Sequence, residues 1–107
     1  MKILIVDDEA GVLRALERLF RRNGHEVRTA TSPAEALAVL DDFTPGAVIS
    51  DFLMNGMSGV EFLGQVAKRV PEARRILLSG YAEVDGQIDA VFIRKPYDAK
   101  DLLRVVQ

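Results

Sequence analysis

The sequence contains no cysteine and no long apolar run. Without cysteine the chain can form no disulfide, no thiolate metal site and no thiol nucleophile. The longest uninterrupted apolar run, residues 36–40, is far shorter than the roughly 20 residues of a membrane-spanning helix. Lys2 is followed by a short strand-like segment and two aspartates rather than by an export signal. We therefore expect a cytoplasmic protein with no membrane partner.

The chain also lacks an excess of either charge. Its 14 Lys and Arg residues and 16 Asp and Glu residues give a formal net charge of -2. The sequence has no long basic tract of the kind that binds the phosphates of nucleic acids. We therefore expect no direct binding of nucleic acid. The length of 107 residues fits one small globular domain and leaves no room for a separate substrate domain. This excludes two-domain enzymes, and we interpret residues 1–107 as a single domain with no further domain in this chain.

Short, mostly apolar runs that stop at polar residues predict strands buried on both faces. These runs are residues 3–6, 47–50, 75–78 and 90–93. Residues 26–30 alternate between polar and apolar instead, which predicts an edge strand.

Helical spacing and capping residues occupy the segments between the strands. The predicted helices span residues 12–22, 33–40, 59–69 and 99–106. Ser32 and Ser58 each stand three residues before a glutamate, and Asp98 can cap the last helix. Residues 82–89 are polar and interrupted by Gly86, so we expect at most two turns of helix there. This alternation predicts an α/β fold, a doubly wound parallel sheet with helices on both faces and a short or irregular helix before the last strand.

Polar residues follow four of the predicted strands. Asp7 and Asp8 follow the first strand, Asp51 the third, Ser79 the fourth and Lys95 the fifth. Ligands of open parallel sheets bind beyond the carboxyl ends of the strands. We therefore expect three carboxylates, one hydroxyl and one ammonium group to converge at one edge of the sheet.

This set of groups suits phosphoryl transfer. Carboxylates so close together repel one another, and a bound cation relieves that repulsion. Oxygen ligands on an open cleft favour Mg²⁺ over zinc or a dedicated calcium site. Lys95 and Ser79 can contact phosphoryl oxygens, and Asp51 is the natural nucleophile for an aspartyl phosphate. Such a reaction needs positioning and charge neutralisation rather than a general base.

Each of these residues also has an ordinary structural interpretation. An aspartate at a strand end often caps a helix or lies in a solvated loop, and Asp8 could cap the first helix. A serine at a strand end is often a turn residue, and a lysine before proline often lies on the surface. Their joint placement on one sheet favours the functional interpretation.

With these residues in place, the sequence resembles the receiver domain of bacterial response regulators over essentially its whole length. The resemblance rests on Asp7-Asp8, residues 51–59, Ser79-Gly80-Tyr81 and Lys95-Pro96. It implies a flavodoxin-like five-stranded sheet with strand order 2-1-3-4-5. It also implies that Asp51 is phosphorylated from the phosphohistidine of a histidine kinase or histidine phosphotransfer protein.

The resemblance further implies roles for single residues. The Mg²⁺ ligands would be Asp7, Asp8, Asp51 and the backbone carbonyl of Leu53. Ser79 and Lys95 would contact the phosphoryl group, and Pro96 would follow a cis peptide bond. A two-state switch would move the Ser79 hydroxyl toward the phosphate and turn Phe92 inward, thereby signalling to a partner or output domain. Phe92 has an equally good interpretation as a core residue.

Two features depart from the family pattern. Asn55 stands where receivers usually have proline, which should loosen the turn after Asp51. The segment between Ser79 and Phe92 is several residues shorter than in most receivers, so the helix expected there is short. Receivers commonly dimerise or contact an output domain through the face made by this helix, the last strand and the last helix, and we do not assume that use here.

The resemblance makes the chain a signalling phosphoacceptor that acts only on itself rather than an enzyme with a separate substrate. Leu53 and Tyr81 would flank the path of attacking water and slow autodephosphorylation. A pseudo-receiver without phosphorylation is the alternative, and the complete set of polar residues argues against it. A phosphatase would need its nucleophile on the first strand and a cap over the substrate, and this chain has no length for a cap. A flavin-binding protein would need a loop rich in Gly, Ser and Thr after the first strand, and the sequence has no such loop there.

Two further features carry weaker signals. Arg14 and Arg18 lie on the polar face of the first predicted helix, which is either a solvated surface or a docking surface for an acidic kinase partner. His25 is the only histidine and precedes the edge strand, so we expect a loop residue rather than a phosphodonor.

Overall fold

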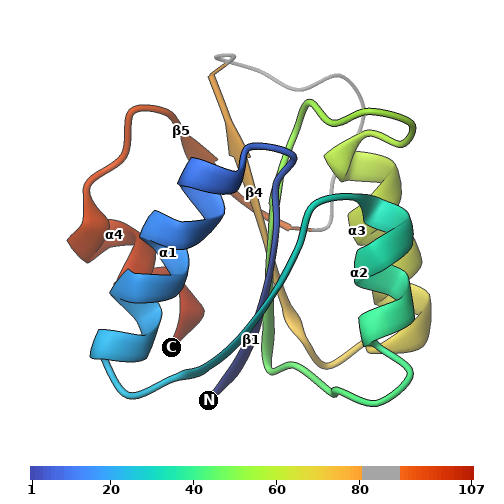
Figure 1. Ribbon diagram of the computed structural model, residues 1–107, viewed down its shortest axis with the longest axis horizontal. Helices are drawn as coiled ribbons and strands as arrows, with labels where there is room; N and C mark the ends of the chain where they lie inside the picture. Colours follow the sequence, from blue (N-terminus) through green and yellow to red (C-terminus); the bar gives the residue numbers. More distant parts are fainter. Residues whose placement is uncertain (81–89) are drawn as a thin grey trace.

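The computed structural model describes residues 1–80 and 90–107 and shows a parallel sheet between two layers of helices (Figure 1). The strands are β1 (Lys2–Val6), β2 (Glu26–Ala30), β3 (Ala47–Asp51), β4 (Arg74–Ser79) and β5 (Val91–Arg94). Their spatial order is β2-β1-β3-β4-β5, which confirms the predicted order. The order reverses between β1 and β3, and this switch point is where open α/β sheets bind their ligands.

Four helices lie within the described parts of the chain, and three of them begin directly after a capping side chain. They are α1 (Ala10–Arg22), α2 (Pro33–Val39), α3 (Gly59–Arg69) and α4 (Ala99–Val106). Ser32, Ser58 and Asp98 each accept a backbone N–H hydrogen bond at the start of a helix, as predicted. Asp8 does not cap α1, because the N-cap residue is Glu9 and no side chain caps this helix.

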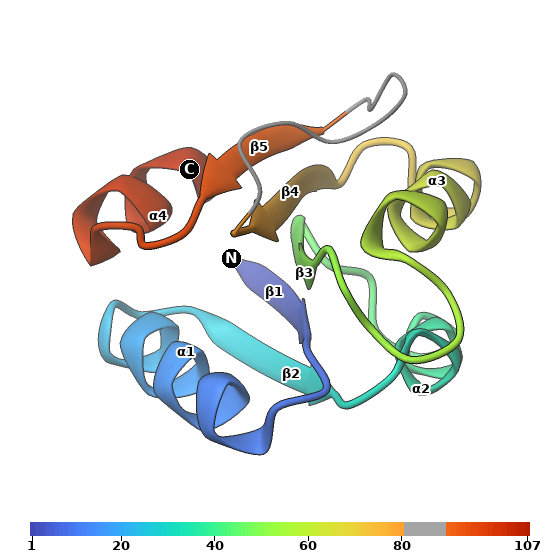
Figure 2. The same ribbon diagram turned by 90° about the horizontal axis from the view of Figure 1, so that it is seen from above.

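The two layers cover opposite faces of the sheet (Figure 2). On one face, α1 and α4 pack on Ile3 and Ile5 of β1. On the other face, α2 and α3 pack on Leu4 and Val6 of the same strand. Because successive side chains of a strand point to opposite faces, a strand covered on both sides is apolar at successive positions, as residues 3–6 of β1 are.

The two edge strands differ from the central ones. In β2, Val27 and Ala30 are buried whereas Glu26 and Arg28 are exposed, which confirms the predicted edge strand. The expectation that β5 is buried on both faces was wrong, since Val91 is 37% exposed and Phe92 is half-buried. The reason is position, because β5 is the last strand of the order and pairs with β4 alone.

Three smaller points complete the fold. The predicted short helix at 82–89 lies outside the described residues. His25 lies in the turn between α1 and β2, as expected, with its ring edge-on to Phe20. No helix in the described parts of the chain has the length and apolar character of a membrane span.

Candidate functional site

The carboxyl ends of the strands meet around one pocket of about 540 Å³. The residues lining it are Asp8, Glu9, Asp51, Phe52, Leu53, Ser79, Gly80 and Lys95. They come from the ends of β1, β3, β4 and β5, so residues more than 80 positions apart in the chain share one cavity. The predicted convergence of polar groups is therefore present in the structure.

Three carboxylates form a compact group at this edge. Oxygen atoms of Asp7, Asp8 and Asp51 all lie within 4.8 Å of one another. Asp7 is only 2% exposed, and its Oδ1 accepts a hydrogen bond from the backbone N–H of Glu9 at 2.9 Å. An all-oxygen donor set at this spacing, with Asp8 and Asp51 lining an open pocket, fits a hard divalent cation such as Mg²⁺ that keeps some of its waters.

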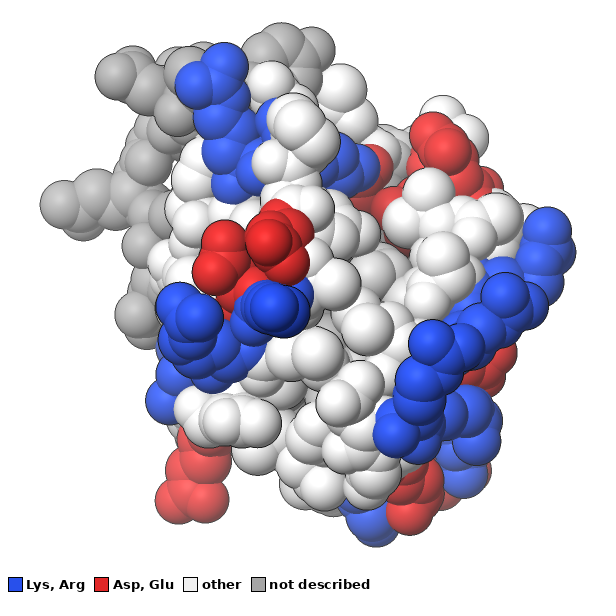
Figure 3. Space-filling view, turned by 90° about the vertical axis from the view of Figure 1, so that its left-hand side faces the viewer, with Lys and Arg blue, Asp and Glu red and all other residues white. Residues whose placement is uncertain are grey.

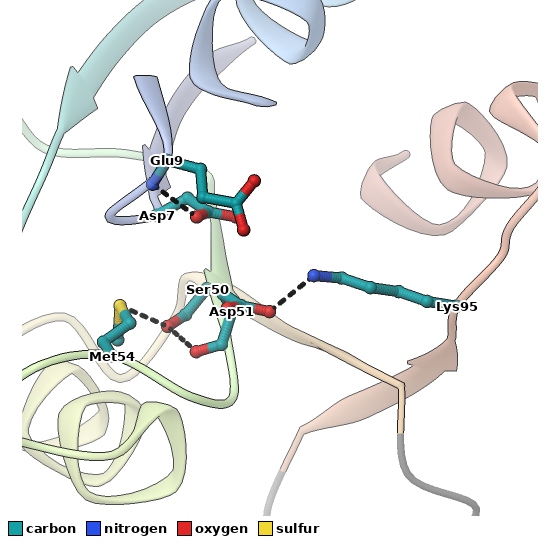
Figure 4. A network of polar contacts seen from close by, with 6 residues as sticks. All are labelled: Asp7, Glu9, Ser50, Asp51, Met54 and Lys95. Carbon is teal, nitrogen blue, oxygen red and sulfur yellow. Dashed lines mark hydrogen bonds and ion pairs between the residues drawn. The ribbon is translucent and has the colours of Figure 1, made fainter. Parts of the chain in front are cut away.

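Lys95 lies against Asp51 (Figure 4). Its Nζ atom is 2.7 Å from Asp51 Oδ1, and the Asp51 side chain is 14% exposed. The Lys95 backbone N–H donates to the Ser79 carbonyl at 2.7 Å, which holds the residue beside the end of β4. The Lys95–Pro96 peptide bond is cis, as the resemblance implied.

Burial and neighbouring charges shift two pKa values in the site. Burial raises the pKa of Asp7, and the charges of Asp51 and Asp8 add to this, while the Glu9 N–H and Lys95 oppose it. Burial acts to lower the pKa of Lys95. Its hydrogen bond to Asp51 and the charges of Asp51 and Asp7 outweigh that effect, so the pKa of Lys95 is raised. Lys95 is therefore held as a cation beside Asp51.

The backbone around Asp51 is held from three sides. Ser50 Oγ donates to the Asp51 carbonyl at 2.9 Å, and the Phe52 N–H donates to the Leu78 carbonyl at 2.9 Å. The N–H of Gly59, the first residue of α3, donates to the Phe52 carbonyl at 2.9 Å. Asp51 is thus fixed by its own strand, by β4 and by α3.

Of the other residues that the sequence singled out, two line the pocket and one does not. Ser79 is 1% exposed and ends β4 at the pocket, and the Leu53 side chain is 56% exposed at the pocket edge. Phe92 is not in the pocket and packs on the core beneath α2 and α3. Tyr81 lies outside the described residues.

Sequence reasoning missed Glu9, Phe52 and Gly80, which also line the pocket. Each directly follows a residue that was predicted: Glu9 follows Asp8, Phe52 follows Asp51, and Gly80 follows Ser79. This adjacency was the available signal.

A second surface feature lies on α1. Arg14, Glu17, Arg18, Arg21 and Arg22 line a groove of about 520 Å³, and Figure 3 shows a band of Lys and Arg side chains over this helix. Arg21 pairs with Glu17 at 3.2 Å and also donates to the Val27 carbonyl. Arg14 and Arg18 are exposed and form no ion pair with any described residue.

Comparison with known proteins agrees with this geometry. The family described as response regulator receiver domain matches residues 3–107. Regulatory protein AtoC of Escherichia coli K12 is 33% identical over 99% of this chain and 24% of its own length. Among the curated relatives compared, this chain spans between 24% and 55% of the relative's full length.

Solved structures agree in fold and sequence. A receiver domain from Clostridium thermocellum superposes with a TM-score of 0.90 and 33% identity, over 98% of this chain and 90% of that one. Response regulator TrrA of Thermotoga maritima, in a complex with Mg²⁺ and BeF, superposes with a TM-score of 0.85 and 30% sequence identity. The match covers 96% of this chain and 93% of that one. With a pocket of carboxylates, a lysine and a serine at the switch point of the same fold, the chain belongs to the response regulator receiver domains, the phosphoacceptor modules of two-component signalling.

Proposed function

We propose that Asp51 accepts a phosphoryl group from the phosphohistidine of a histidine kinase or a histidine phosphotransfer protein. The observation that carries this assignment is the 2.7 Å contact between Lys95 Nζ and Asp51 Oδ1 beside two further carboxylates. An Asp51 oxygen forms the new bond to phosphorus, the bond from phosphorus to the histidine nitrogen breaks, and the histidine ring leaves neutral once it has a proton. No base from this chain is needed, because the nucleophile is a carboxyl oxygen of Asp51, which has no hydroxyl or amine proton to remove, and the Lys95 ammonium group contacts that carboxyl group.

The pocket residues divide the remaining work. Lys95 pairs with a phosphoryl oxygen, and Ser79, at the end of the adjacent strand, hydrogen-bonds another. Asp7, Asp8, Asp51 and the backbone carbonyl of Leu53 would hold Mg²⁺. When bound, Mg²⁺ supplies positive charge that offsets the carboxylates and the incoming phosphoryl group. The close spacing of the three carboxylates and the buried position of Asp7 support this fit.

Phosphorylation then changes the conformation that a partner reads. We assign the switch to Ser79 and Phe92, because Ser79 lines the pocket and Phe92, half-buried on the neighbouring strand, packs against the core. The reader is an output domain or a downstream protein. Among the relatives, NtrC of Escherichia coli carries the name DNA-binding transcriptional regulator, and we assign no direct nucleic-acid binding to this chain itself.

In this proposal residues 1–107 act as one cytoplasmic receiver domain that works only on itself. It takes up one phosphoryl group and hydrolyses it slowly, so it is not an enzyme with a separate substrate. The pocket is large enough to hold one phosphoryl group together with a metal ion, which supports the uptake of a phosphoryl group.

The decisive experiment is intact-mass measurement after incubation with acetyl phosphate and Mg²⁺. We expect one added phosphoryl group in the wild-type chain, none in Asp51→Asn and none with a chelator. Asp42→Asn is the matched control, because Asp42 is an exposed aspartate outside the pocket and should leave phosphorylation unchanged. If the folded wild-type chain gains no phosphoryl group from acetyl phosphate or from a phosphorylated histidine kinase, the proposal is overturned and the chain is a pseudo-receiver.

A further inference from the structure

Glu9 adds a fourth carboxylate to the mouth of the pocket. It directly follows Asp8, lines the pocket with Asp51 and Lys95, and stands at the N-cap of α1 without capping the helix through its side chain. Its side chain is exposed and forms no hydrogen bond or ion pair with any other described residue. Figure 4 shows this side chain turned toward the side of Asp7 on which Asp51 and Lys95 lie. Its structural surroundings therefore give the carboxylate no other partner within the described chain.

The Glu9 carboxylate is not placed to be a direct metal ligand. The group whose oxygens lie within 4.8 Å of one another consists of Asp7, Asp8 and Asp51. Glu9 contributes to that group through its backbone, since its N–H orients Asp7 Oδ1. Its side chain can act only through intervening water or through its electric field.

We propose that Glu9 is a positioning residue that raises Mg²⁺ affinity by accepting hydrogen bonds from metal-bound water and, by its charge, slows the entry of anionic phosphodonors. This inference rests on the proposed function. Mg²⁺ keeps several waters when few protein ligands are offered, and those waters need acceptors. Groups that hold such waters tune metal affinity without touching the metal.

The same charge has opposite effects on the two ligands of the pocket. It attracts a divalent cation, but it repels a phosphodonor that arrives as an anion. Because the carboxylate is exposed, both effects weaken as salt is added. A purely structural role of Glu9 at the helix start would not produce this pair of opposite changes.

Calorimetric titration of the whole chain with Mg²⁺ tests the first effect. Glu9→Gln should weaken Mg²⁺ binding by about threefold to tenfold at low salt, and less at high salt. Glu72→Gln is the matched control. It removes the same charge from an exposed glutamate in the turn before β4, at the end of that strand remote from the pocket, and should leave the affinity unchanged.

The second effect is read from the rate of phosphorylation by acetyl phosphate at saturating Mg²⁺. Glu9→Gln should react about twofold or more faster than the wild-type chain at low salt, because one repelling charge is gone. An unchanged Mg²⁺ affinity in Glu9→Gln, with binding still abolished in Asp8→Asn, would overturn the role of Glu9 alone. Absence of saturable Mg²⁺ binding in the wild-type chain would overturn the metal site and this inference together.

Discussion

Gly59 and Asp51 approach each other so closely that no side chain fits between them. A Cβ atom on Gly59 would overlap the carbonyl oxygen of Asp51 and would lie 2.7 Å from Leu77 Cδ1. Gly59 is the first residue of α3, and its N–H holds the Phe52 carbonyl. The start of α3 is therefore seated directly on the end of β3, and this contact fixes the backbone that carries Asp51.

Gly59→Ala should destabilise the fold and disturb the site together. Relief of the overlap requires the Asp51 backbone to move, and overpacking of this kind typically costs about 1–3 kcal/mol. Urea unfolding gives the free energy, and intact mass gives the extent of phosphorylation. Gly64→Ala is the control in the same helix, because nothing lies within 4 Å of a Cβ there, and it should stabilise the helix by about 0.5–1 kcal/mol. Equal stability of the two alanine variants would contradict the argument.

Asp7 should make the cation-free protein less stable as the pH rises. Burial raises its pKa in the folded state above the unfolded value. The stability that Asp7 contributes is therefore complete below its ordinary pKa and is lost as the pH rises through the raised folded pKa. Asp7→Asn keeps an oxygen acceptor for the Glu9 N–H and removes the charge, so it should increase the free energy of unfolding at neutral pH.

This increase should shrink as the pH falls toward 4, where the wild-type carboxyl is protonated as well. Urea unfolding in chelator at several pH values measures it. Asp42→Asn, which removes an exposed charge outside the pocket, should show no such pH dependence. A variant less stable than the wild-type chain at neutral pH would count against the interpretation.

Reversal of Arg14 or Arg18 to glutamate should slow phosphotransfer from a phosphohistidine partner. Both arginines line the α1 groove and are unpaired within the described residues, so they are free to meet an acidic surface. Phosphorylation by acetyl phosphate, which needs no protein docking, should keep its rate. Lys68→Glu makes the same charge change on α3 and should leave both rates unaltered. Transfer rates equal to the wild-type rate would assign the arginines to a solvated face.

Leu53 should slow the loss of the phosphoryl group. Its exposed apolar side chain stands at the pocket edge two residues after Asp51, where water would approach the phosphoryl group. We expect the phosphorylated state to persist for minutes or longer. Leu53→Asn should shorten that lifetime severalfold, because an amide side chain can hydrogen-bond the attacking water at this position. A time course of intact mass after removal of the donor measures it. A wild-type lifetime of only seconds would refute the expectation.

Local sequence signals predicted most of the fold. The capping pairs at Ser32 and Ser58 act within four residues, and the apolar runs of β1 and β3 report burial on both faces without knowledge of the neighbours. The burial of β5 was predicted wrongly, because strand composition does not say how many neighbours a strand has.

The candidate site was predictable as a set of residues but not as an arrangement. The strand-end positions of Asp7, Asp51 and Lys95 follow from the sequence pattern, because parallel strands end at one edge. The ion pair between Lys95 and Asp51, the burial of Asp7 and the place of Glu9 at the pocket did not follow. Each depends on side-chain directions that only the packed sheet sets.

The sequence by itself therefore determined the fold class, the strand order through family resemblance, and the identity of the reactive groups. The tertiary structure decided their distances, their burial and the opposing fields of Lys95 and Glu9 at one pocket. The physical reason is range. Turns, caps and periodicity act between residues close in sequence, whereas the electrostatics of the pocket arise between groups up to 87 positions apart that meet only when the sheet is assembled.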